Sequence, residues 1–117
     1  MDTSTTTNDL ICSDKVEGTA VYNNTGEKLG SVDSLMIDKR SGQVRHAVLE
    51  FGGFLGLGTD RYPLPWSMLK YDTDLEGYVV PLNESQLTDA PRYPQNDESP
   101  FMSDAGYGQR VNNFYGS

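Results

Sequence analysis

The chain has 117 residues, the length of a single domain, and its nine basic and seventeen acidic residues give a formal net charge of −8. This charge repels phosphate groups, and the sequence holds no basic stripe or cluster. Direct binding of nucleic acid and adsorption to an anionic membrane are therefore not expected. Cys12 is the single cysteine, so a disulfide within one chain is excluded.

The first thirteen residues are rich in Thr and Ser, and we expect them to be flexible. They lack the basic region and apolar core of a signal peptide, and no apolar run reaches the roughly 20 residues that span a bilayer. We therefore expect a cytoplasmic protein without membrane insertion. Cys12 has only Lys15 as a basic neighbour in this part of the sequence, so it is expected to be inert.

Residues 14–90 hold nearly all the branched aliphatic side chains and predict short strands separated by turns. The expected strands cover residues 18–22, 29–37, 44–51, 61–65 and 77–82. In the second of these, Val32 falls on the opposite parity from Leu35 and Ile37, so we expect a bulge near Asp33 and Ser34. The prolines of residues 61–65 restrict that segment to an edge or irregular strand.

Shorter signals lie between the strands. Residues 38–42 predict a turn, residues 66–70 allow one helical turn, and Asn83 with Gln86 resembles a capping box. Residues 72–77 imitate the start of a calcium loop, but the twelfth position is Asn83 and not Glu, so we interpret them as a polar hairpin turn.

The stretch FGGFLGLGTDRYPLPW, residues 51–66, raises the question of a phosphate-binding loop. No helix signal follows its glycines, so a phosphate site is not expected. The glycines instead favour a wide hairpin connection that carries Phe54, Leu55 and Leu57. These three side chains either fold back over the end of the domain or contact another subunit or a partner protein.

No catalytic, cofactor-binding or metal-binding residues are predicted. His46 is the only histidine, so a multi-histidine metal site or a triad with a second base cannot be built, and we expect it at the surface or rim. Trp66 is interpreted as a core residue, although it could mark a ligand pocket.

Residues 91–117 contain Pro, Gly, Asn and Ser without an apolar period and predict an irregular segment. This segment nevertheless holds five aromatic residues: Tyr93, Phe101, Tyr107, Phe114 and Tyr115. Docking on the domain or on a second subunit is therefore left open.

Across residues 14–90 the sequence resembles a PRC-barrel domain. The resemblance rests on the Gly-Glu-x-x-Gly pattern that begins at Gly26, on the Phe-Gly-Gly-Phe-Leu-Gly run from Phe51, and on the pair Pro65–Trp66. It implies an all-β fold, a small barrel of about five to six short antiparallel strands with short helical turns. The family includes the barrel of the photosynthetic reaction-centre H subunit and that of a ribosome maturation factor. The membrane helix of the first and the additional N-terminal domain of the second have no counterpart here, so a stand-alone bacterial member is expected and neither role is transferred.

The resemblance implies a partner-binding barrel and carries no family-wide catalytic residues. We therefore expect a non-catalytic protein-interaction module and a homodimer, with Phe54, Leu55 and Leu57 in the contact. A barrel that binds a small ligand near Trp66, and an accessory protein of ribosome or RNA maturation, remain alternatives.

Overall fold

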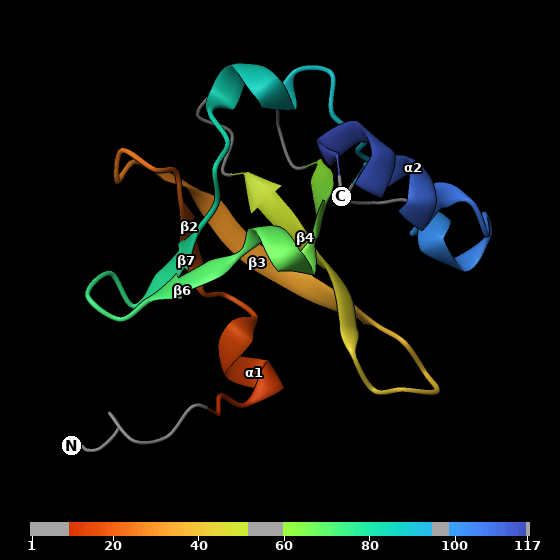
Figure 1. The fold of residues 1–117 in the computed structure, drawn as a ribbon, viewed down its shortest axis with the longest axis horizontal. Helices are drawn as coiled ribbons and strands as arrows, with labels where there is room; N and C mark the ends of the chain where they lie inside the picture. Colours follow the sequence, from red (N-terminus) through yellow and green to blue (C-terminus); the bar gives the residue numbers. More distant parts are fainter. Residues whose placement is uncertain (1–9, 52–59, 95–98, 117) are drawn as a thin grey trace.

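The computed structural model describes residues 10–51, 60–94 and 99–116, which form a twisted six-stranded sheet with an α-helix on either side (Figure 1). The elements in chain order are α1 (Ser13–Val16), β2 (Ala20–Tyr22), β3 (Lys28–Ile37), β4 (Val44–Phe51), β5 (Arg61–Pro65), η1 (Trp66–Met68), β6 (Lys70–Asp72), β7 (Gly77–Val79), η2 (Glu84–Leu87), η3 (Pro100–Met102) and α2 (Tyr107–Tyr115).

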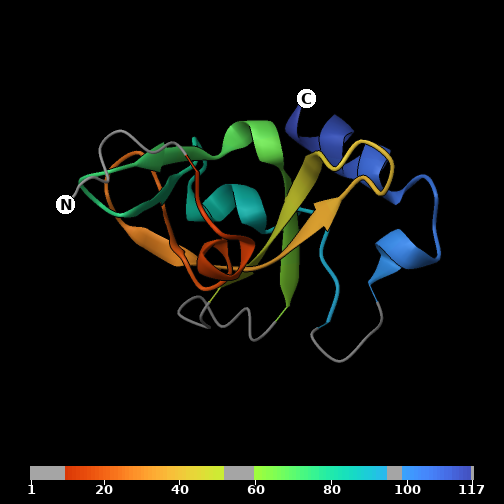
Figure 2. The same ribbon diagram turned by 90° about the horizontal axis from the view of Figure 1, so that it is seen from below.

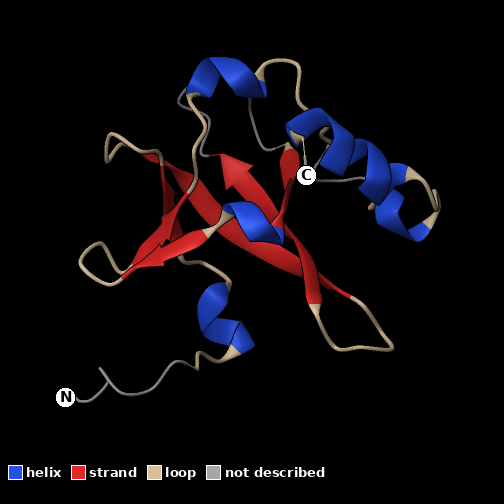
Figure 3. Cartoon of the chain, viewed as in Figure 1, coloured by secondary structure: helices blue, strands red, loops and turns tan. Residues whose placement is uncertain are grey.

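The strand order of the sheet is β5-β4-β3-β2-β7-β6 (Figure 3). Neighbouring strands are antiparallel except β2 and β7, which run parallel. The expected predominance of β-structure is confirmed, whereas the expectation of antiparallel pairing throughout is wrong. The chain crosses from β5 through η1 and the β6–β7 hairpin, and it then returns beside the first strand in the same direction. Within the described residues no ladder joins β5 to β6, so closure of a barrel is not seen there.

The β3–β4 hairpin forms the centre of the sheet, and its register confirms the predicted bulge. Val32 pairs with Leu49 and Ser34 pairs with Val48, which leaves Asp33 as the additional residue. The two backbones also approach closely at Gly30, where a Cβ atom would lie 2.1 Å from the carbonyl oxygen of Glu50. Only glycine fits at this position without a backbone shift.

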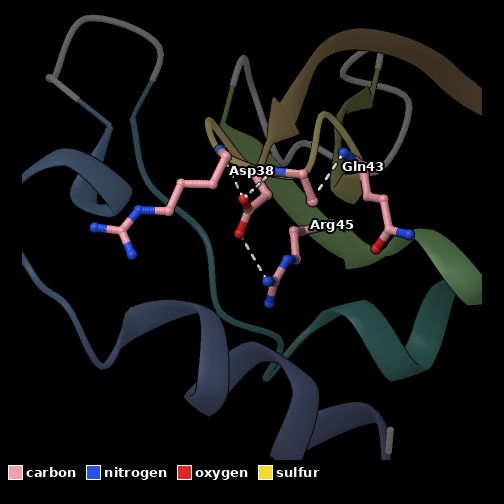
Figure 4. A network of polar contacts seen from close by, with 5 residues as sticks. Asp38, Gln43 and Arg45 are labelled. Carbon is pink, nitrogen blue, oxygen red and sulfur yellow. Dashed lines mark hydrogen bonds and ion pairs between the residues drawn. The ribbon is translucent and has the colours of Figure 1, made fainter.

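The turn between β3 and β4 is organised by Asp38 (Figure 4). One carboxylate oxygen accepts hydrogen bonds from the backbone N–H groups of Arg40 and Ser41, both at 2.9 Å. The other oxygen pairs with the guanidinium of Arg45 at 2.7 Å. These interactions, led by the Ser41 N–H, lower the pKa of Asp38. The turn predicted for residues 38–42 is therefore confirmed.

Strand β5 lies at one edge of the sheet, as its prolines predict. All five of its residues are nevertheless buried. Tyr93 continues the ladder on the outer side, since the backbone groups of Arg61 and Tyr93 exchange two hydrogen bonds, at 2.7 and 3.0 Å. The guanidinium of Arg61 lies 3.2 Å from Asp33 and 3.4 Å from Glu50, so this buried charge is compensated by two carboxylates.

The shorter elements agree only in part with the predictions made from the sequence. The helical turn in residues 66–70 is confirmed as η1, and the capping box is confirmed by reciprocal hydrogen bonds between Asn83 and Gln86. Asp72 accepts hydrogen bonds from the N–H groups of Asp74 and Leu75, which organises the β6–β7 hairpin turn. Strand β6 and helix α1 were not expected, and strand β7 ends earlier than predicted.

The core cluster is built from buried aliphatic and aromatic residues of β2, β3, β4, β5 and β7, together with Val16 of α1 and Leu87 of η2. Its largest fully buried members are Phe51, Tyr62, Leu29, Leu49 and Leu64. Trp66 is half-buried at the margin of this cluster, with its ring centroid 5.6 Å from that of Tyr78. Trp66 therefore packs against the core, as the sequence suggested, but it lies at the edge of the core.

The prediction that residues 91–117 are irregular is wrong for α2, a nine-residue helix that packs against β5 (Figure 2). Its buried residues Tyr107 and Val111 are spaced by four and face the sheet. The helix ends at Tyr115. The next residue, Gly116, adopts a left-handed φ of 76°, and its N–H donates to the carbonyls of Asn112 and Asn113. Within the described chain, the C-terminal helix therefore lies against its own sheet.

Candidate functional site

The sequence-predicted contact residues Phe54, Leu55 and Leu57 lie outside the described residues. The described part of the chain offers a different candidate surface, where residues of η1, η2 and α2 line a common groove. This surface depends on the docking of α2, so the contacts of that helix come first.

Helix α2 covers His46 of strand β4. The amide oxygen of Asn112 accepts a hydrogen bond from His46 Nε2 at 2.9 Å, and the ring of Phe101 lies 5.1 Å from the imidazole. A Cβ atom on Gly108 would lie 3.2 Å from His46 Cε1, so a small residue allows this close approach. His46 is 6% exposed, and the prediction of a surface or rim position is therefore wrong.

Burial determines the protonation of His46. It lowers the pKa of the imidazole below the ordinary value of 6.5, and the positive charge of Arg45 acts in the same direction. The hydrogen bonds to Asn112 and to the Gly108 carbonyl oppose this effect without reversing it. At neutral pH the imidazole is uncharged, and its contacts with α2 help to hold the helix against strand β4.

Three tyrosine hydroxyl groups are buried around the same helix. Among the described residues, the hydroxyls of Tyr107 and Tyr115 have no hydrogen-bond partner, whereas that of Tyr62 has the guanidinium of Arg92 beside it. Burial raises the pKa of each phenol, that of Tyr107 to about 12. A buried hydroxyl without a partner costs about 1–3 kcal/mol. The helix therefore docks through apolar contacts that must overcome a polar penalty.

A groove with a volume of about 420 Å³ opens beside the last turn of α2. Its apolar wall is formed by Met68, which ends η1, and by Pro81 and Leu82, which precede η2. Phe114 and Tyr115 of α2 also line the groove. The volume lies within the range of about 300–1,000 Å³ that is typical of ligand and peptide pockets.

The polar groups of the groove differ in their availability. Ser85 donates a hydrogen bond to Asn83 at 2.6 Å, and the side-chain oxygen of Gln86 accepts one from the Asn83 N–H at 2.8 Å, so both belong to the cap of η2. The carboxylate of Asp89 is exposed and has no ion-pair or hydrogen-bond partner within residues 10–51, 60–94 and 99–116. Asp89 is therefore the charged side chain of the groove that is available to bind a partner.

The groove was not predicted from the sequence. Its residues come from three segments that are distant along the chain, and only the C-terminal segment gave a signal. Tyr107, Val111 and Tyr115 recur at intervals of four before a glycine, which is the pattern of a helix face and its C-cap. Glycine and asparagine between them obscure that pattern, because both are poor helix formers.

Three further observations concern other kinds of site. Cys12 is exposed, as a free thiol. Within the described ranges, no group of His, Cys, Asp and Glu residues is arranged to hold a metal ion. The same ranges hold no helix with the length and apolar character of a membrane span.

Comparison with known proteins places the sheet in a family. The model of the PRC-barrel domain matches residues 9–87, a range that ends with the last residue of η2. No curated protein matches the chain in sequence. The matched region contains all six strands and lacks α2. Because this match covers well over half of the sequence, the chain belongs to the PRC-barrel domain family.

Proposed function

We propose that the chain is a non-catalytic protein-interaction module of the cytoplasm, which acts by surface recognition. The observation that carries this proposal is the groove between the PRC-barrel domain and α2, with the ring of Phe114 43% exposed on its wall. Large apolar side chains that stay exposed beside a groove are typical of binding surfaces.

The chemistry of the titratable side chains supports a non-catalytic role. His46 lies beneath α2 and is hydrogen-bonded to Asn112, so it does not face the groove wall of Met68, Pro81 and Leu82. The buried phenols have raised pKa values, which keeps them protonated near neutral pH.

The proposal includes a homodimer that uses Phe54, Leu55 and Leu57. The support for this part is the sequence alone, which places three apolar residues among glycines in a hairpin connection. The groove and the hairpin are then separate surfaces, one for a partner and one for a second copy.

Site-specific photo-crosslinking tests both parts in the full-length chain. The photoreactive residue p-benzoylphenylalanine replaces Phe54, Phe114 or, as a control, Tyr71, an exposed aromatic residue on β6. We expect a covalent dimer of the chain from position 54, an adduct with another protein from position 114, and neither from position 71. The partner should be recovered again by purified chain and lost with Phe114→Asp.

The outcomes separate the two parts. Absence of a covalent dimer from position 54 contradicts the homodimer, and a partner adduct from position 71 as abundant as that from 114 contradicts the groove as the binding surface. Failure to form adducts from either 54 or 114 contradicts the interaction module itself.

A further inference from the structure

The groove combines one available charge with aromatic and apolar walls. Asp89 supplies an exposed carboxylate that has no partner among the described side chains, whereas Ser85 and Gln86 are engaged in the cap of η2. A carboxylate of this kind forms its strongest hydrogen bonds with guanidinium and ammonium groups.

The aromatic wall favours the same class of ligand. The ring of Phe114 packs edge-on against Tyr115, with centroids 4.9 Å apart and planes at 84°. The exposed part of this ring borders the groove that Asp89 also lines. The face of an aromatic ring attracts cations, and the methylene stem of a lysine or arginine packs on it.

Among the described residues that line the groove, none is a lysine or an arginine. Arg92, three residues after Asp89, is already engaged: its guanidinium lies 3.2 Å from Asp60 and donates a hydrogen bond to the carbonyl of Thr88 at 3.0 Å. The net charge of −8 repels acidic segments and attracts basic ones. Charge complementarity therefore favours a positively charged segment of a partner.

We infer that this groove binds a short basic segment of a partner protein. A lysine or arginine of that segment pairs with Asp89 and lays its stem on Phe114, and a neighbouring apolar side chain packs on Met68 and Leu82. The inference rests on the proposed interaction function and specifies the chemistry of the partner.

Selection from a displayed library of random peptides tests the inference, with the full-length chain as the target. We expect the enriched peptides to share a lysine or arginine beside an apolar residue. One enriched peptide, and its copy with that cation replaced by glutamine, are then measured by fluorescence polarisation. The glutamine copy should bind about fivefold to tenfold more weakly to the wild-type chain.

Three variants locate the site. Asp89→Asn should weaken binding of the basic peptide by the same factor, so that the basic peptide and its glutamine copy bind the variant with equal affinity. Phe114→Ala should weaken both peptides. The matched control Asp74→Asn removes one charge from the β6–β7 turn, which lies away from α2 in Figures 1 and 2, and should leave the affinity unchanged.

The inference is overturned if the enriched peptides lack lysine and arginine, if Asp89→Asn and Asp74→Asn behave alike, or if no peptide is enriched. None of these results decides the proposed function. That function is tested by the crosslinks from position 114, which report any protein partner whatever its charge.

Discussion

At the scale of single residues, His46 has the most informative environment. Its imidazole is buried between β4 and α2, where Asn112, the Gly108 carbonyl, the ring of Phe101 and the charge of Arg45 surround it. Loss of hydration is the dominant effect and lowers the pKa. The ring therefore contributes to helix docking in its neutral form.

This environment predicts a pH dependence of stability. Below the ordinary histidine pKa of 6.5, His46 is protonated in the unfolded chain, whereas the folded chain keeps the imidazole neutral until the pH reaches the lowered pKa. The contribution of His46 is complete above that pH and declines as the pH falls through the window down to the lowered pKa. Urea unfolding between about pH 7.5 and about pH 5.5 measures the free energy of unfolding across this window.

The matched variant is His46→Gln, which keeps a neutral donor that can reach Asn112. Most carboxylates titrate below this window, so the variant should show a flatter dependence on pH than the wild-type chain. Parallel curves for the two proteins would show that His46 does not titrate in this way.

At the scale of elements, the closest contact in the sheet lies between β3 and β4. A Cβ atom at Gly30 would lie 2.1 Å from the carbonyl oxygen of Glu50 and 3.0 Å from Cα of Phe51. Both are backbone atoms of a central strand, so the clash cannot be relieved by a side-chain rotation.

Gly30→Ala should therefore lower the free energy of unfolding by about 3 kcal/mol. Gly106→Ala is the control, because its Cβ would meet only side-chain atoms of Arg110 and Asp104, at 3.2 and 3.6 Å, and should change stability by less than about 0.5 kcal/mol. Urea unfolding followed by Trp66 fluorescence gives both values. Equal losses at the two positions would mean that β3 and β4 can separate locally without cost.

Elements whose signals are local were predictable, and those that depend on distant contacts were not. The strand Val44–Phe51, with its consecutive apolar residues 47–49, and the offset at Asp33 are visible within a few residues, and both are found in the structure. The parallel pairing of β2 with β7 depends on a crossover of the chain, which no local pattern encodes. His46 could not be assigned to the interior because the helix that buries it was itself missed.

The whole molecule consists of a region that matches the family and a C-terminal segment that lies beyond the match. The family match ends at residue 87, while the C-terminal segment continues to α2. The groove lies at their junction. Its apolar residues Met68 and Leu82 belong to the matched region, whereas Asp89 and Phe114 lie beyond it. The surface chemistry that would select a partner therefore belongs to this chain and not to the fold that the family shares.

This division predicts that α2 can be released while the sheet remains folded. Val111 is fully buried in the helix, so Val111→Asp places an unpaired carboxylate against the sheet. The buried phenols already make docking costly, and release of the helix is cheaper than burial of the charge. Asn113→Asp adds the same charge at an exposed position of the same helix and is the control.

NMR can follow the two parts separately in these variants. With Val111→Asp, the amides of α2 should lose their protection from hydrogen exchange, and the pKa of His46 should rise to about 6.5 as the imidazole becomes hydrated. The amides of β3 and β4 should stay protected, and Asn113→Asp should resemble the wild-type chain. Loss of protection throughout the sheet would show instead that α2 and the PRC-barrel domain fold as one cooperative unit, so that the groove could not be dismantled without unfolding the protein.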